Sequence, residues 1–200
     1  MKKLTFLTLV AALSACAPAD VTGAAGQPVI PEKQTVSIEA ITTSTKGFTV
    51  GSAVSARTTY VFFDAQCPHC ATLWNAAKPL HAQMKFVWIP VGILNKASTA
   101  QGIALLAASD PAAKMDEHEL SLLAHKGGIS ASANADPALA SAVITNTRVL
   151  RSFGAESIPF VVALNADGTV VSAPGAGTTQ ALAQMIGVTY TPSDAGATPR

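Results

Sequence analysis

The sequence predicts an α/β domain whose mixed central sheet is flanked by helices, with a helical insertion between a β-α-β half and a β-β-α half. Two apolar, β-branched runs, residues 58–63 and 85–91, lie on either side of one helical segment, which is typical of a parallel β-α-β unit with a right-handed crossover. The pattern from about 97 to 154 is helical. Residues 159–172 then predict a hairpin around the turn sequence Asn-Ala-Asp-Gly, and residues 178–186 predict a closing helix.

Shorter signals predict the remaining elements. Residues 36–41 alternate apolar and polar side chains and predict a short strand or arm, and residues 46–51 predict a further short strand or the entry to a turn. The Gly127-Gly128 pair and two Asp-Pro steps divide the helical region into three helices. The third helix is opened by Asp136-Pro137. We expect it to turn five apolar side chains inward: Leu139, Val143, Ile144, Val149 and Leu150.

Composition supports one domain with its own core and argues against a nucleic-acid ligand. The chain has 200 residues, of which 49% are hydrophobic. Its formal charge is +1 and only 12% of its residues are charged, so the electrostatic footprint of nucleic-acid binding is missing. The three cysteines are an odd number, which calls for an explanation if the protein is exported.

The N-terminus supplies that explanation. Two lysines precede an apolar run over 4–13 that is too short to span a membrane, and the ending Leu-Ser-Ala-Cys at Cys16 resembles a bacterial lipoprotein signal. We therefore expect residues 1–15 to be a signal peptide and Cys16 to be lipidated. The alternative is an ordinary cleaved signal with an unpaired cysteine. Ala17 in the position after the cysteine predicts the outer membrane, facing the periplasm, where conditions are oxidising.

The rest of the chain divides by composition. Residues 16–34 are small or turn-forming and predict a flexible tether between the lipid and the domain. Residues 35–188 are expected to form the folded domain, with the helical insertion at about 97–154. Residues 189–200, which contain Pro and Gly and few apolar side chains, predict a disordered tail.

The sequence Cys67-Pro68-His69-Cys70 follows the apolar run 58–63 and opens a helix. Unpaired backbone N–H groups and the helix dipole at that position stabilise an anion, and the thiolate is the reactive form of cysteine. Pro68 suits the first helical position, and Cys70 lies one turn on, close enough to form a disulfide with Cys67. His69 either favours the Cys67 thiolate by its charge or faces solvent with little influence.

The order of the predicted elements, with Cys-x-x-Cys after an early strand, resembles the thioredoxin-like arrangement. Further motifs resemble the DsbG branch of bacterial thiol:disulfide interchange proteins, which are relatives of DsbC. They run in order along the chain: Phe62-Phe63-Asp64, Cys67 to Cys70, Trp74 with Ala77 and Pro79, Val91-Gly92, Leu105 to Ala112, Gly127-Gly128, and Phe153 to Pro159. The resemblance implies that Pro159 forms a cis peptide with Ile158, faces the cysteine pair and presents backbone groups to substrate. From the sequence alone, a trans proline at a strand start is the alternative.

The chain also departs from this branch. Only residues 17–55 are available where DsbG and DsbC carry a dimerisation domain and linker, so we expect a monomer. His69 gives the dipeptide typical of DsbA oxidases, and Ile158 is more thioredoxin-like than the usual Thr. Many thioredoxin-like proteins have a buried carboxylate six residues before the first cysteine. That position is Val61 here, so a proton relay would need Asp64 or water.

These observations predict a periplasmic thiol–disulfide oxidoreductase with no cofactor beyond its own cysteine pair. Cys67 is the expected exposed nucleophile with a depressed pKa, and Cys70 the more buried resolving thiol. The resemblance implies reduction or interchange of disulfides and sulfenylated cysteines in envelope proteins, with a membrane redox partner of the DsbD type. The alternative is a DsbA-like oxidase of folding proteins with a DsbB-type partner.

A metal or copper chaperone is an alternative of a different class. Thiolates and histidines are ligands for Cu(I) and zinc, so the cysteine pair and a histidine could form such a site. The candidates beyond His69 are His81, His118 and His125. The last two fall on one predicted surface helix, where solvated side chains are expected, so we predict no metal ligands.

Overall fold

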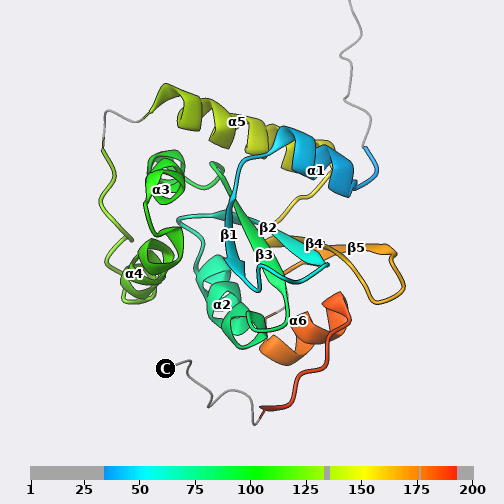
Figure 1. Ribbon diagram of the computed structural model, residues 1–200. Helices are drawn as coiled ribbons and strands as arrows, with labels where there is room; N and C mark the ends of the chain where they lie inside the picture. Colours follow the sequence, from blue (N-terminus) through cyan, green and yellow to red (C-terminus); the bar gives the residue numbers. More distant parts are fainter. Residues whose placement is uncertain (1–33, 133–135, 176, 193–200) are drawn as a thin grey trace, which may run out of the picture. The chain divides into compact units, whose positions relative to one another are not determined.

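The computed structural model describes residues 34–132, 136–175 and 177–192 (Figure 1). The predicted signal peptide, Cys16, nearly all of the predicted tether and the chain after 192 lie outside the described residues. Within the described ranges, none of the helices has the length and apolar character that a membrane span requires.

Five strands of the described chain form one mixed sheet in the order β1-β3-β2-β4-β5. They are β1 (Phe48–Gly51), β2 (Thr58–Asp64), β3 (Lys85–Val91), β4 (Phe160–Leu164) and β5 (Val170–Pro174). Strands β2 and β3 pair in parallel, whereas β1 with β3, β2 with β4 and β4 with β5 pair antiparallel. The predicted parallel unit and the predicted hairpin are both confirmed.

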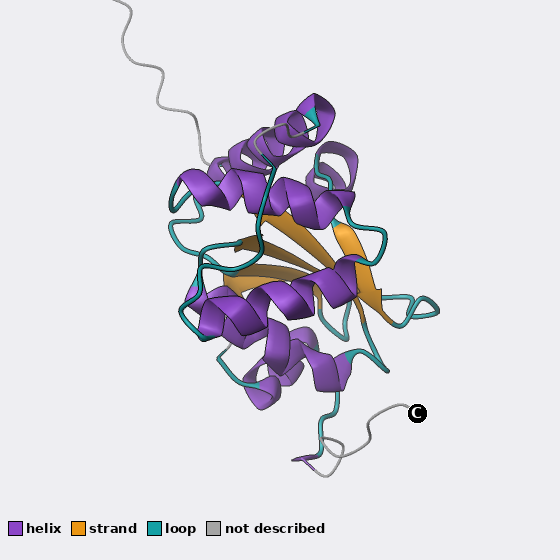
Figure 2. Ribbon diagram, turned by 90° about the vertical axis from the view of Figure 1, so that its left-hand side faces the viewer, coloured by secondary structure: helices purple, strands orange, loops and turns teal. Residues whose placement is uncertain are grey.

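Helices cover both faces of this sheet. They are α1 (Ile38–Ser44), α2 (Pro68–Ala77) with the 3₁₀ turn η1 (Lys78–Leu80), α3 (Lys96–Ala107), α4 (Pro111–Leu123), α5 (Pro137–Ser152) and α6 (Thr179–Ile186). Figure 1 shows α1 and α5 on one face and α2 and α6 on the other, and the turned view shows the sheet between the two layers (Figure 2). Helix α3 packs on α5 and β3, and α4 packs on α2 and α3. The predicted helical insertion is therefore present, and α4 reaches the helix that carries the cysteines.

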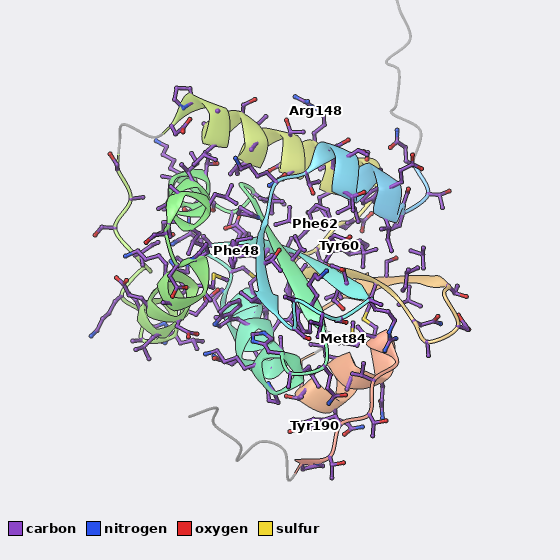
Figure 3. The ribbon with its side chains drawn as sticks, viewed as in Figure 1. Phe48, Tyr60, Phe62, Met84, Arg148 and Tyr190 are labelled. Carbon is purple, nitrogen blue, oxygen red and sulfur yellow. The ribbon has the colours of Figure 1, made fainter. Side chains whose placement is uncertain are left out.

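The apolar run of β2 is continuous because the strand is buried on both faces. Val61 and Phe63 belong to the core cluster shared with α2 and α6. Phe62, between them, belongs to the cluster shared with α1 and α5. In Figure 3, Phe62 and Tyr60 lie on the α1/α5 side and Met84 lies toward α6.

The prediction of a strand or arm over residues 36–41 is wrong. The segment becomes helix α1 because Ser37 caps it, its hydroxyl accepting the Ala40 N–H at 3.3 Å. Ile41 is fully buried and packs in the same cluster as Phe62. A polar cap and one deeply buried apolar residue define this short helix, and the alternation of side chains was misleading.

Ile144 is also misassigned, because 56% of it is exposed. The inward stripe of α5 is completed by two polar residues that make hydrogen bonds inside. The Asn146 amide donates to the Pro90 and Lys46 carbonyls, at 2.9 and 2.8 Å, and accepts the Lys46 N–H. Thr147 accepts the Gly92 N–H at 3.0 Å. Apolar periodicity alone does not reveal such a stripe.

Candidate active site: a cysteine pair at a helix N-terminus

Cys67 is the N-cap residue of α2 and Pro68 occupies the first helical position. The chain reaches it by a tight turn from the end of β2, in which the Cys67 N–H donates to the Asp64 carbonyl at 3.0 Å. The Cys70 N–H donates to the Cys67 carbonyl at 2.9 Å, closing the first helical turn. The predicted strand, thiol pair and helix are therefore joined as expected, with both cysteines present as free thiols.

The two thiols have opposite electrostatic environments. The pKa of Cys67 is lowered to about 6, chiefly because the Cys70 thiol donates to its sulfur, with smaller help from the backbone N–H groups of Cys70 and His69. The pKa of Cys70 is raised well above its ordinary value by burial and by the neighbouring Cys67 thiolate. One sulfur therefore ionises easily and the other resists ionisation.

Cys67 is less accessible than expected. Only 4% of it is exposed, and Cys70 is fully buried. The reason is the loop before β4, whose Ile158 carbonyl oxygen lies 3.8 Å from the Cys67 sulfur and accepts its S–H. The prediction of an exposed nucleophile is wrong, because Cys67 is buried in the reduced protein.

The peptide between Ile158 and Pro159 is cis, as the family resemblance implied. The loop is held from the far side by Gly175, whose N–H donates to the Pro159 carbonyl at 2.7 Å. A Cβ at Gly175 would lie 2.5 Å from Cγ of Pro159, so only glycine permits this approach. Strands β4 and β5 thus fix the proline loop against the cysteine pair.

Asp64 anchors the segment that precedes the cysteines. Its carboxylate is fully buried and accepts three backbone N–H groups, from Gln66 at 2.9 Å, Ile93 at 2.7 Å and Leu94 at 3.0 Å. Because both oxygens already hold amides, the structure gives Asp64 a fixed positioning role between β2 and the loop after β3.

Pro68 and His69 are exposed beside the cysteine pair. The charge of His69 lowers the pKa of Cys67, but it is the smallest of the recorded influences and ranks below the hydrogen bonds. Of the two interpretations of His69, the structure therefore favours a modest electrostatic influence.

The expectation that His118 is solvated is wrong. It is fully buried, and both ring nitrogens have partners inside: the Ile129 N–H donates to Nδ1 at 3.1 Å, and Nε2 lies 2.6 Å from the Ala65 carbonyl. His125 lies beyond the end of α4 and is exposed, whereas His81 packs among aromatic rings, Trp74 and Phe86. Among the described residues, no group of three or more potential metal-ligand side chains comes together.

A further buried ionisable side chain, Glu119, was missed by sequence reasoning. It lies on the inward stripe of α4, beside His118. Burial raises its pKa to about 8, and the charge of Cys67 adds to this rise. A signal was available: Met115 and Leu122 are seven residues apart, so residues 118 and 119 must share their helix face.

An apolar hollow of about 450 Å³ opens beside the cysteines. Ile93 and Leu94 are partly exposed on it, at 40% and 50%. Its lining comes from the start of α2, the loop after β3, the end of α5 and the proline loop: Cys67, Pro68, His69, Ile93, Leu94, Leu150, Arg151, Ala155, Glu156, Ser157 and Ile158. Such a hollow suits apolar side chains of an extended peptide.

A thiol pair at the start of a helix, in contact with a cis-proline loop, together with a mixed sheet and a helical insertion, defines a thioredoxin-like, DsbA-type fold. The solved thiol-disulfide exchange protein α-DsbA2 of Wolbachia pipientis has this fold with a TM-score of 0.52, at 20% identity over 70% of this chain and 85% of that one.

Comparison of sequences gives a narrower assignment. The thiol:disulfide interchange protein DsbG of Pseudomonas aeruginosa is 31% identical over 139 residues, 68% of this chain and 54% of its own. DsbG of Escherichia coli is 27% identical over 118 residues, 58% of this chain and 47% of its own. No family model matches. The chain is similar to these DsbG thiol:disulfide interchange proteins and spans about half the length of the curated relatives it matches.

Proposed function

We propose that the protein is a periplasmic thiol–disulfide oxidoreductase that reduces or rearranges disulfides of envelope proteins. The observation that carries this proposal is the opposite perturbation of two adjacent thiols, with the pKa of Cys67 lowered to about 6 and that of Cys70 raised. The names of the DsbG relatives support the same reaction class.

The reaction begins with the Cys67 thiolate, which attacks one sulfur of a substrate disulfide. The other substrate sulfur leaves as a thiolate and takes a proton from solvent, and a mixed disulfide joins Cys67 to the substrate. Cys70 then loses its proton and attacks the Cys67 sulfur, releasing the second substrate thiol. The protein ends as the Cys67–Cys70 disulfide, and a membrane reductant of the DsbD type supplies the two electrons that restore it.

Substrate would be held by backbone groups and by the apolar hollow. The Ile158 carbonyl faces the Cys67 sulfur and can accept an N–H from an extended substrate chain once the thiol has reacted. The hollow beside it would take an apolar side chain near the substrate cysteine. We infer a preference for unfolded or extended segments, in which both features can be reached together.

A dithiol oxidase is the second candidate, and the lowered pKa of Cys67 favours it. Each unit of depression makes the disulfide about 30 mV more oxidising, because the thiolate of the reduced form is stabilised. The reduction potential, measured by equilibration with glutathione, separates the two. A potential as oxidising as about −120 mV supports an oxidase, and one near −200 mV or below supports a reductase or isomerase.

Capture of substrates tests the proposal in cells. Cys70→Ala leaves the mixed disulfide on Cys67 without its resolving thiol, so partner proteins should accumulate as adducts that reducing agent releases. Cys67→Ala in the same cells should capture none. Adducts that form equally in both variants would contradict the proposed chemistry.

We also propose that Cys16 carries a lipid that places the domain on the periplasmic side of the outer membrane. The lipoprotein-type ending at Cys16 supports this. Cells fed labelled palmitate should label the wild-type chain and not a Cys16→Ser variant. Equal labelling, or labelling of neither chain, would argue against the anchor.

A further inference from the structure

Glu119 carries an unpaired carboxyl group inside the protein. Only 1% of the residue is exposed, and neither carboxyl oxygen has a hydrogen-bond partner among the described residues. Buried carboxylates are normally paired, because removing an ionised group from water without compensation is expensive. A fold that keeps such a group in place calls for an explanation.

The charged side chains that interact with the Glu119 carboxyl group show which part of the site it belongs to. Helix α4 packs on α2, and the titratable groups of α2 and its flanking residues that interact electrostatically with Glu119 are Cys67, Cys70 and Lys78. Lys78 has another partner, since its amine lies 2.6 Å from the Asp116 carboxylate. The thiol pair is therefore the chemistry to which Glu119 is coupled.

Other candidate bases in this part of the chain are already engaged. Both oxygens of Asp64 accept backbone amides. The buried His118 accepts an N–H at Nδ1, so its Nε2 carries the proton that it donates to the Ala65 carbonyl. Val61 stands where many thioredoxin-like proteins have a carboxylate. Among the described residues, His81 also has an unpartnered ring nitrogen, but it packs against Trp74 and Phe86, whereas both oxygens of Glu119 are free and its charge acts on Cys70.

We propose that Glu119 accepts the proton of Cys70 when Cys70 attacks the mixed disulfide, and returns it when the pair is reduced again. The inference rests on the proposed interchange function and adds a group from the helical insertion to it. No hydrogen bond joins Glu119 to Cys70 in the reduced protein, so the transfer takes place once the two side chains have come within hydrogen-bond distance or through one water. In resolution, the Cys70 S–H bond breaks, its proton moves to a Glu119 oxygen, and the sulfur's electron pair forms the bond to Cys67. The substrate sulfur leaves with the electrons of the old disulfide bond.

The charge state of Cys67 determines the stage at which Glu119 can accept the proton of Cys70. In the dithiol, the Cys67 thiolate repels a second negative charge, which helps to hold Glu119 in its protonated form. In the mixed disulfide, Cys67 is uncharged, and that repulsion is gone. Glu119 thus ionises more readily at the stage when Cys70, whose own ionisation is opposed by burial, must lose a proton.

A two-phase reaction with Ellman's reagent separates the steps. In a full-length Cys16→Ser background, the reduced pair should release one equivalent of thionitrobenzoate as Cys67 attacks, and a second as Cys70 resolves the adduct. Glu119→Gln should slow the second phase at least tenfold at pH 7 and leave the first within twofold. Glu117→Gln is the matched control, since Glu117 lies on the same helix, is the same residue type and is exposed.

The pH profile distinguishes proton transfer from a structural or purely electrostatic role. The second phase of the wild type should level off above the pKa of Glu119, whereas in Glu119→Gln it should keep rising tenfold per pH unit until Cys70 itself ionises. A second phase that is unchanged or faster in Glu119→Gln would overturn the proposal, since loss of a repelling charge alone helps Cys70 to ionise. Failure of the wild type to release a second equivalent would instead overturn the interchange function.

Discussion

The sulfur of Cys67 lies 3.8 Å from the carbonyl oxygen of Ile158, although 91 residues separate them in sequence. The contact joins the start of α2 to the loop before β4, so the nucleophile and the backbone group that would bind substrate are held by two neighbouring strands, β2 and β4. The reactivity of Cys67 and the placing of substrate therefore depend on the same sheet.

Replacing Gly175 by alanine should disturb that contact. The new methyl group would meet the Pro159 ring at 2.5 Å, so the proline loop must shift away from Cys67. We expect at least a tenfold loss of insulin reduction with dithiothreitol as electron donor. Gly177→Ala is the matched control, because nothing lies within 4 Å of its added Cβ, and equal losses in both variants would contradict the argument.

Asp64→Asn should destabilise the fold. An amide offers one oxygen and an NH₂ group where two oxygens now accept three backbone N–H groups, so at least one donor is left facing another donor. We expect a loss of about 2 kcal/mol or more in the free energy of unfolding, measured with urea. Asp110→Asn, at a helix N-cap where asparagine serves as well, should lose less than about 0.5 kcal/mol. Similar losses of unfolding free energy in both variants would show that the three hydrogen bonds to Asp64 do not stabilise the fold more than a helix cap does.

Glu119→Gln should stabilise the reduced protein, and increasingly so as the pH rises. An acid with a pKa of about 8 in the folded chain and 4.5 in the unfolded chain binds more protons when folded. Its contribution to stability is therefore complete below pH 4.5 and is lost progressively up to about pH 8. At pH 7 the penalty removed by Gln is on the order of 3 kcal/mol. Urea unfolding at pH 5 and pH 7 measures it, and a stability gain that is absent or shrinks with pH would contradict the burial of a free carboxyl.

Cys70→Ala should raise the pKa of Cys67. The hydrogen bond from Cys70 is the largest cause of its depression, and alanine removes the donor. Cys70→Ser keeps an O–H donor and should keep most of the depression. The rate of iodoacetamide labelling against pH reports both, and identical midpoints in the two variants would show that the hydrogen bond is not responsible.

Much of this structure could be predicted from sequence because the signals are local. The apolar runs of β2 and β3, the Asp-Pro helix starts and the hairpin turn each reflect neighbouring residues, and the Cys-Pro-His-Cys segment shows a thiol pair at a helix start. The prediction for residues 36–41 failed because the Ser37 cap favours a helix more than the weak alternation of apolar and polar side chains favours a strand.

The parts that were missed depend on contacts between distant elements. The burial of His118 and Glu119 follows from the packing of α4 on α2. The spacing of Met115 and Leu122 places both residues on one helix face, but it does not show which element covers that face. The near-complete covering of Cys67 depends on a loop 91 residues away. The polar stripe of α5 is stable only because backbone groups of β3 and of the segments before β1 and after β3 meet Asn146 and Thr147.

The pKa of Cys67 in the reduced wild-type protein tests the central claim most directly. Its alkylation rate should be followed across pH in a Cys16→Ser background, with the modified residue identified by mass spectrometry. The account predicts a midpoint at about 6, with Cys70 unlabelled over the same range. A midpoint near 9, the ordinary value for this thiol, or faster labelling of Cys70 than of Cys67, would contradict it.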